Sequence, residues 1–270
     1  MTRVARPESP KHFPPLRRKL VFALGLILAS IFFYTRSGSE TRPNASAEIG
    51  TKYGSSSSEL VTGTVDGVAY YHCFGSGDTS SSAKTQHLVL LHGARFTKED
   101  WKTSGILTKF CRNKNLSVSA MDLPVSAGHQ ELTELLTAMQ DEGLVSLPVA
   151  LVTPSASGKT VTDWMKAGEN RIDELPKYVF RWIPVASGSV ATTTDEQVRN
   201  LQNLESFSVF AIFGNKDSNG EKTSNILGTL GGAKVLEIQG GHPCYLDSPD
   251  DFVAAILENL GVSKLSAGND

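Results

Sequence analysis

Short apolar runs alternate along this chain with segments in which apolar residues recur every three or four positions. The runs are rich in Val, Ile, Leu and Phe and have the length of buried strands. They lie at residues 86–91, 116–121, 147–153, 178–185, 207–213 and 234–238. The helical period is clearest at Leu132, Leu135, Leu136 and Met139, and again at Phe252, Ala255, Ile256 and Leu260. Alternating strand and helix units predict a mostly parallel α/β sheet with helices on both faces.

Residues 60–74 predict an antiparallel hairpin ahead of these units. Apolar and aromatic residues flank Asp66-Gly67, a dipeptide that favours a two-residue turn. The two strands of the hairpin and the six later runs together predict an eight-stranded sheet.

The first fifty-odd residues do not have the pattern of a folded domain. Residues 20–34 form an uncharged apolar run after Arg17, Arg18 and Lys19, although the run is shorter than the roughly 20 residues of a spanning helix. A cleaved signal peptide is the alternative, but the A-x-A-like site at 45–47 lies far beyond the run. We favour an uncleaved signal anchor, single-pass type II, with the folded domain luminal or extracellular. Cleavage would instead give a secreted protein.

The chain therefore divides into five predicted parts. These are a basic cytosolic N-terminus at 1–19, a transmembrane anchor at 20–35, a flexible Ser-rich stem at 36–58, a folded domain at 59–262 and a tail at 263–270. The stem contains too few apolar residues to fold alone. Asn44 and Asn115 lie in N-x-S sequons and are candidate glycosylation sites if the domain is luminal.

Charge and cysteine count narrow the class of protein. The formal net charge is −2, and beyond the N-terminus Lys and Arg are scattered, which argues against nucleic-acid binding. Cys73, Cys111 and Cys244 are odd in number and have no motif spacing, so we expect buried thiols, although an oxidising compartment would allow one pair. No residue pattern points to a metal, and no cofactor is required.

The most informative segment is 147–160, LPVALVTPSASGKT, in which a buried strand runs into a turn of small residues. This order places Ser155 at the tip of the turn. A hydrolase nucleophile elbow, G-x-S-x-G, needs such a bend so that the serine hydroxyl projects from the sheet. Thr153 and Ser157 occupy the two glycine positions here.

The same residues have two other interpretations. Residues 153–160 match the phosphate-binding G-x-x-x-x-G-K-[ST] loop except at its first glycine, with Lys159 and Thr160 in the roles of phosphate and magnesium ligands. Pro154 lacks a backbone donor and Thr153 does not adopt glycine-only conformations, so this nucleotide-binding reading is the weaker one. The second alternative is an ordinary strand-to-helix turn without a chemical role.

Other strand ends carry the residue types that a serine nucleophile requires. Asp217 follows the strand at 207–213, and His242 follows the strand at 234–238 in a glycine-rich loop. The chain order Ser, Asp, His is that of α/β-hydrolases, in which the acid orients the histidine and the histidine takes the serine proton. The backbone N–H groups of Ala94 and Ala156 are then the expected oxyanion donors. Singly, Asp217 could cap a helix and His242 could be a turn residue.

The motifs HGARF, TPSAS, FGNKD and GGHPCYLDSPDDF resemble the abhydrolase-domain-containing protein 14 family over residues 60–262, and the basic and apolar N-terminus resembles its membrane-anchored member. The resemblance implies an α/β-hydrolase fold with Ser155 as nucleophile, Asp217 as acid and His242 as base. It also implies activity on small acyl or ester substrates, including an acyl-lysine or acyl-transfer role proposed for the soluble relative.

Two further loops bear on substrate choice. Relatives carry a glycine-rich D-L-P-G-x-G loop at 122–130, where this chain has Val125 in place of the first glycine; we expect this loop to border the active site. We interpret Asp122 and His129 in it as structural. The segment 186–203 predicts a minimal lid, and hence a shallow pocket for small acyl groups. The alternative to an enzyme is a membrane-tethered binding module that keeps the fold without turnover.

Overall fold

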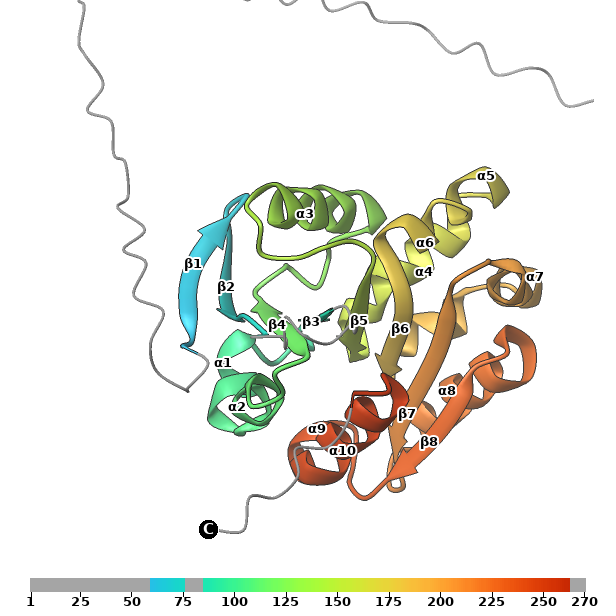
Figure 1. Ribbon diagram of the computed structural model, residues 1–270. Coiled ribbons are helices and arrows are strands. Elements are labelled where there is room, and N and C mark those ends of the chain that lie inside the picture. The colour runs from blue at the N-terminus through green and yellow to red at the C-terminus, as the bar shows by residue number, and fades with distance from the viewer. Residues whose placement is uncertain (1–58, 76–84, 263–270) are drawn as a thin grey trace, which may run out of the picture. The chain divides into compact units, whose positions relative to one another are not determined.

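The computed structural model describes residues 59–75 and 85–262. Within them a single sheet has the strand order β1-β2-β4-β3-β5-β6-β7-β8, with β1 at one edge and β8 at the other (Figure 1). The strands are β1 Val61–Val65, β2 Val68–Cys73, β3 Gln86–Leu90, β4 Leu116–Met121, β5 Val149–Pro154, β6 Val179–Val185, β7 Ser208–Gly214 and β8 Lys234–Ile238. The predicted α/β-hydrolase sheet is confirmed, and each observed strand overlaps a predicted one.

Strand direction follows the length of the connections. β1 and β2 pair antiparallel from Val65 opposite Val68, and Asp66 and Gly67 between them have φ of 48° and 76°. Positive φ at both residues is the geometry of a type I′ turn, so the predicted hairpin is confirmed. β2 also runs antiparallel to β4, whereas all the later pairs are parallel and joined through helices.

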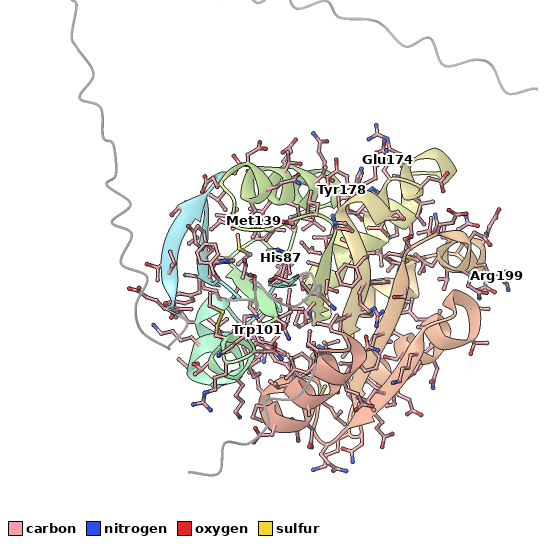
Figure 2. All side chains as sticks on the ribbon, viewed as in Figure 1. His87, Trp101, Met139, Glu174, Tyr178 and Arg199 are labelled. Atoms are coloured by element: carbon pink, nitrogen blue, oxygen red, sulfur yellow. A yellow bond between two sulfur atoms is a disulfide. The ribbon has the colours of Figure 1, made fainter. Side chains whose placement is uncertain are left out.

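Helices cover both faces of the sheet. They are α1 Lys98–Thr103, α2 Ile106–Cys111, α3 His129–Asp141, α4 Lys159–Lys166, α5 Glu169–Ile172, α6 Leu175–Tyr178, α7 Asp195–Arg199, α8 Ser218–Gly231, α9 Cys244–Asp247 and α10 Pro249–Asn259, with 3-10 turns η1 Ser155–Gly158, η2 Gly188–Thr192 and η3 Asn200–Asn203. Two separate apolar clusters result: α3, α4 and α8 contribute to one, and α1, α2 and α10 to the other. Trp101 and Met139, labelled in Figure 2, belong to different clusters.

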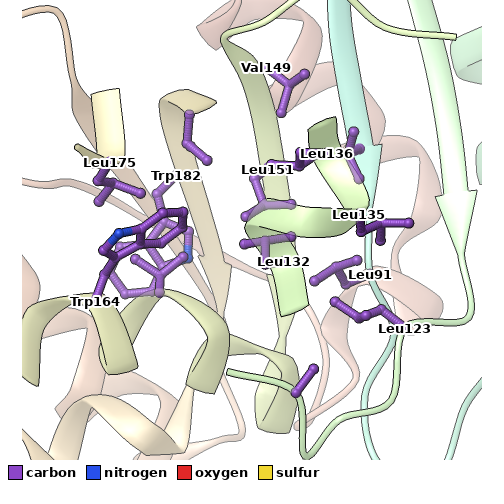
Figure 3. Packing of buried hydrophobic residues seen from close by; sticks show 14 of the residues in the cluster. Leu91, Leu123, Leu132, Leu135, Leu136, Val149, Leu151, Trp164, Leu175 and Trp182 are labelled. Atoms are coloured by element: carbon purple, nitrogen blue, oxygen red, sulfur yellow. The ribbon is translucent and has the colours of Figure 1, made fainter. Parts of the chain in front are cut away.

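The predicted helical stripes pack onto the sheet. Leu132, Leu135 and Leu136 of α3 lie near Leu91 and Leu151, as Figure 3 shows. Side chains of this size each contribute about 1.5–3 kcal/mol when fully buried. On the other face, Phe252 and Ile256 of α10 are fully buried. Both stripes are therefore core positions and not binding surfaces.

The cysteine prediction was wrong in part, because Cys73 and Cys111 form a disulfide. β2 pairs with β4, and α2 packs against β4, so the two residues are brought to a Cα–Cα distance of 5.8 Å, which suits a disulfide. They are 38 residues apart in the sequence, and only the strand order reveals their proximity. Cys244 is the buried thiol that we expected, and burial raises its pKa to about 12.

The N-terminal predictions concern residues that the structure does not describe. The cytosolic segment, the anchor, the stem, the sequon at Asn44 and the tail at 263–270 all lie outside the described residues. In the described ranges, none of the helices combines the length and the apolar character needed to cross a membrane.

Candidate active site

The predicted elbow has an unusual backbone at its tip. β5 ends at Pro154, η1 begins at Ser155, and α4 follows from Lys159. Ser155 has φ of +52°, in the left-handed region that residues other than glycine rarely adopt. Strain of this kind persists where the surroundings fix it, and it turns the Ser155 side chain out of the strand direction.

The residues at the two glycine positions of the elbow have internal hydrogen-bond partners. Thr153 is fully buried, and its Oγ1 accepts a hydrogen bond of 2.8 Å from the indole N–H of Trp182 on β6. Ser157 is also buried, and its hydroxyl donates to the Pro154 carbonyl at 2.9 Å. The departure from glycine therefore leaves no buried polar group unpaired in the elbow, which accounts for its tolerance in this chain.

Gly158 is the position in the elbow that requires glycine. A Cβ added there would lie 1.6 Å from the Ser187 Oγ, in the loop that follows β6. The Ser187 hydroxyl donates to the Ser155 carbonyl at 3.3 Å. Close packing of this loop against η1 thus holds the tip of the elbow. In the sequence, Gly158 matches only the second glycine of the phosphate-binding pattern, so its role in the elbow becomes visible only in the structure.

The structure brings Ser155, His242 and Asp217 together, although 87 residues separate the first two. His242 Nε2 lies 2.8 Å from Ser155 Oγ, and His242 Nδ1 lies 2.7 Å from Asp217 Oδ2. The Asp217 side chain is 9% exposed and that of His242 is 50% exposed. With Nδ1–H donated to the carboxylate, Nε2 is the acceptor for the serine proton.

The simpler interpretation of Asp217 as a helix cap does not describe its side chain. Asp217 does occupy the N-cap position of α8, but its carboxylate makes no capping hydrogen bond. The carboxylate instead faces His242. The loop that carries His242 is tied to the end of β7 because the Gly240 N–H donates to Asn215 Oδ1. It is also held to α9, where Asp247 Oδ2 accepts from the Gly241 N–H.

A cavity of about 200 Å³ opens at Ser155 and His242. Its lining residues are Gly93, Ala94, Arg95, Phe96, Pro154, Ser155, Val185, His242, Pro243 and Tyr245. Most of this wall is apolar, and burial raises the pKa of the Tyr245 phenol, which keeps it neutral. Ala94 is central in a turn closed by a 3.0 Å hydrogen bond from Phe96 N to the Gly93 carbonyl. Ala156 directly follows Ser155 in η1 and is not among the lining residues.

The expectation that the loop at 122–130 borders this cavity was wrong, because none of its residues lines the cavity. Asp122 accepts hydrogen bonds of 2.7 Å from both the backbone N–H and the Nζ of Lys98, at the start of α1. It therefore supports the neighbouring loop after β3, which does line the cavity. His129 begins α3, and its ring packs near Trp164. The structural interpretation of both residues agrees with these contacts.

The remaining candidates have ordinary partners. Lys159 forms an ion pair with Asp163 one turn along α4, and the Thr160 hydroxyl donates to the Ser157 carbonyl, so both side chains of the phosphate-binding alternative have partners within the elbow and its helix. Asn115 is partly exposed just before β4. Among the described residues, no three His, Cys, Asp or Glu side chains are grouped to hold a metal ion.

Comparison with known proteins relates this site to a family. No protein-family model matches the chain. Human ABHD14B, named as a candidate protein-lysine deacylase, is 30% identical over 186 residues, which cover 64% of this chain and 82% of that protein. This chain belongs to the ABHD14 family of α/β-hydrolases. Human ABHD14A is 26% identical over 190 residues, covering 67% of this chain and 66% of that protein.

Solved structures agree with the fold of the ABHD14 family. The S-formylglutathione hydrolase of Staphylococcus aureus has a TM-score of 0.55 at 11% identity, covering 75% of this chain and 98% of that one. A CIB-like hydrolase from Thermoplasma acidophilum has a TM-score of 0.53 at 16% identity, covering 76% and 98%. These likenesses establish the α/β-hydrolase fold, and membership of the ABHD14 family supports assignment to the hydrolases.

Proposed function

We propose that this protein is a serine hydrolase that releases small acyl groups from esters or from acylated lysine side chains through an acyl-enzyme. The observation that carries the proposal is the hydrogen-bonded series from Ser155 through His242 to Asp217, at the mouth of a small cavity. The name of human ABHD14B supports acyl-lysine as one substrate class.

The geometry supports a two-step reaction. Ser155 Oγ attacks the acyl carbonyl carbon while His242 Nε2 takes the serine proton, and Asp217 keeps His242 in the tautomer that accepts it. The N–H groups of Ala94 and Ala156 stabilise the oxyanion. His242 then protonates the leaving group, and in the second step it activates water, which releases the acid and restores the Ser155 hydroxyl.

The size of the cavity favours short acyl groups. Its volume of about 200 Å³ is below the roughly 300–1,000 Å³ of pockets for drug-sized ligands. The segment between β6 and β7 contains only η2, α7 and η3, of which η2 packs against η1 at the elbow, in keeping with a minimal lid. A marked preference for long-chain esters would contradict this part of the proposal.

Turnover by the full-length protein tests the proposal. The substrates are 4-nitrophenyl acetate, 4-nitrophenyl decanoate and an acetyl-lysine peptide, and the variants are Ser155→Ala and Ser157→Ala. We expect hydrolysis of the acetate to be abolished in Ser155→Ala and kept in Ser157→Ala, because the Ser157 hydroxyl bonds to Pro154 and not to His242. If folded wild-type protein hydrolyses none of the three, the membrane-tethered binding module becomes the better description.

We propose further that the domain resides in the lumen of the secretory pathway or outside the cell, held by the anchor at 20–35. The Cys73–Cys111 disulfide supports an oxidising compartment. A glycan on Asn44 or Asn115 is expected there. Loss of a glycosidase-sensitive mass shift in the double variant Asn44→Gln, Asn115→Gln would support this location; a cytosolic, reduced and unglycosylated protein would contradict it.

A further inference from the structure

Arg95 is the permanently charged side chain in the wall of the cavity. The other lining residues are small, apolar or neutral, apart from His242, and none carries a carboxylate. Arg95 is exposed, and it forms no ion pair or side-chain hydrogen bond with any residue in the described ranges. A cation facing a small, otherwise neutral cavity makes that cavity favourable for an anion.

The acidic residues around this loop are already engaged. Glu99 accepts hydrogen bonds from the Tyr71 hydroxyl, and Asp100 accepts from the Thr97 N–H as part of the cap of α1. Asp122 is paired with Lys98. Beyond the loop, Asp217 bonds to His242. Each of these carboxylates has a fixed partner, so the Arg95 guanidinium is left for a ligand.

The backbone presents Arg95 beside the reacting groups. Ala94 and Arg95 are the two central residues of the turn from Gly93 to Phe96. Their Cα atoms are consecutive and hence about 3.8 Å apart. The Lys98–Asp122 contacts fix the end of this loop, so the position of Arg95 relative to Ser155 is set by the fold. An acyl group whose carbonyl lies at Ser155 therefore occupies the cavity that Arg95 also lines.

We propose that Arg95 binds a carboxylate at the far end of the acyl group, so that the site takes short dicarboxylic acyl groups such as succinyl and glutaryl. The proposal rests on the proposed hydrolase function and names its substrate class. A guanidinium binds a carboxylate through two parallel hydrogen bonds, which fixes both distance and orientation. The cavity of about 200 Å³ limits the acyl chain to a few carbons between the two carboxyl carbons.

The reaction remains a hydrolysis and needs no co-reactant other than water. The bond from Ser155 Oγ to the acyl carbon forms, the bond from that carbon to the leaving group breaks, and His242 passes the serine proton to the leaving group. Water then adds to the acyl carbon and releases the free dicarboxylate with Ser155 restored. The carboxylate on Arg95 is unchanged throughout.

Paired substrates test the role of Arg95 in the full-length protein. The substrates are the mono-4-nitrophenyl ester of glutaric acid and 4-nitrophenyl butyrate, which share a leaving group, with Ser155→Ala giving the uncatalysed background. We expect Arg95→Gln to lower kcat/KM for the glutarate ester about tenfold to hundredfold and to leave that for butyrate nearly unchanged. Arg95→Lys keeps the charge without the planar fork and should lose less. Arg171→Gln, at an exposed position of α5, is the matched control and should change neither.

Two outcomes would overturn the proposal. Equal losses on both esters would assign Arg95 to the fold or to the leaving group that the two esters share. The absence of a preference of the wild type for the anionic ester would contradict a carboxylate site.

A binding measurement separates this proposal from the hydrolase proposal. The probe is N-ethylglutaramic acid, an unreactive glutaryl amide, titrated calorimetrically into wild type and Arg95→Gln. Binding that is lost in Arg95→Gln, in a protein that hydrolyses neither ester, would uphold the carboxylate site and reject the hydrolase. Turnover of butyrate without any binding of the probe would uphold the hydrolase and reject the carboxylate site.

Discussion

The two ends of the sheet are held and used differently. At the end formed by β1, β2 and β4, the contacts are covalent or buried: the disulfide of Cys73 and a 2.8 Å hydrogen bond between His72 and Ser119. At the end formed by β5 to β8, the strand ends carry Ser155 and Asp217 and lead to the half-exposed His242. The loop after β3 lies between them and is tied to the first end by Asp122. The comparison teaches that stability and chemistry are separable in this fold, so substitutions at the two ends should have different signatures.

The largest effect should come from Asp217→Asn at the chemical end. The amide favours the wrong tautomer of His242, and in a well-studied triad the equivalent change lowers kcat about 10⁴-fold. The melting temperature should stay within a few degrees of that of the wild type, since the substitution is isosteric. Measuring kcat and thermal unfolding on one preparation checks both. A small loss of activity accompanied by marked destabilisation would break the comparison.

The double variant Cys73→Ser, Cys111→Ser should lower the stability of the protein and leave its turnover unchanged. The bond closes a loop spanning 38 residues, and the chain-entropy model assigns such a loop about 4 kcal/mol of stability. Turnover per folded molecule should be unchanged, because neither cysteine lines the cavity. Urea unfolding and active-site titration measure the two quantities, with reduced wild-type protein as the control. A reduced wild type as stable as the oxidised one would contradict this expectation.

His72, in the end of the sheet formed by β1, β2 and β4, should make the stability of the fold decrease at acid pH. Its side chain is fully buried, and burial, with a smaller contribution from nearby His87, lowers its pKa from 6.5 to about 4. Between these values the unfolded chain binds the proton that the folded protein excludes, so stability is complete above pH 6.5 and falls as the pH drops toward 4. The loss is at most about 3 kcal/mol. The free energy of unfolding should change less between pH 7 and pH 5 in His72→Gln than in wild type. An equal change in both proteins would show that His72 does not cause the acid sensitivity.

Asp122→Ala should lower both stability and turnover, because it removes the contact with Lys98 that holds the loop between the two ends of the sheet. Lys98 loses two hydrogen bonds of 2.7 Å, a cost of about 2 kcal/mol. The cavity-lining turn at Ala94 is then less fixed, and we expect kcat to fall about tenfold through weaker oxyanion stabilisation. Asp122→Asn keeps one acceptor and should recover part of both losses. Loss of stability alone would make the contact purely structural.

Val125→Gly should have the smallest effect. The residue lies in the loop after β4 that does not line the cavity, so kcat/KM should stay within about twofold. Stability should fall by no more than about 1 kcal/mol, because glycine increases the freedom of the unfolded chain. Ester kinetics and urea unfolding check these values. A changed acyl preference in this variant would show that the loop at 122–130 contributes to the active site after all.

The strand ends explain why much of the site could be predicted. Parallel strands in alternation with helices place their carboxyl ends at one edge, so Ser155, Asp217 and His242 were expected to meet there, and they do. The family resemblance supplied their roles. Periodicity likewise placed the core stripes on α3 and α10.

The features that were missed depend on relations between distant elements. The pairing of Cys73 with Cys111 follows from β2 lying next to β4 and from α2 packing on β4. The requirement for Gly158 follows from the approach of Ser187, and the support of the Ala94 turn follows from the reach of Asp122 to Lys98. No local pattern encodes these contacts. Arg95 is different, because the sequence does place this cation within HGARF, next to the expected oxyanion donor Ala94.

Labelling with a fluorophosphonate probe tests the central claim most directly. Full-length wild type, Ser155→Ala, Ser157→Ala and His242→Ala are treated with the probe, and the modified peptide is mapped by mass spectrometry. The account predicts one adduct on Ser155 in wild type and in Ser157→Ala, and none in the other two variants. Adduct formation elsewhere, or equal labelling of His242→Ala, would contradict an activated serine at this elbow.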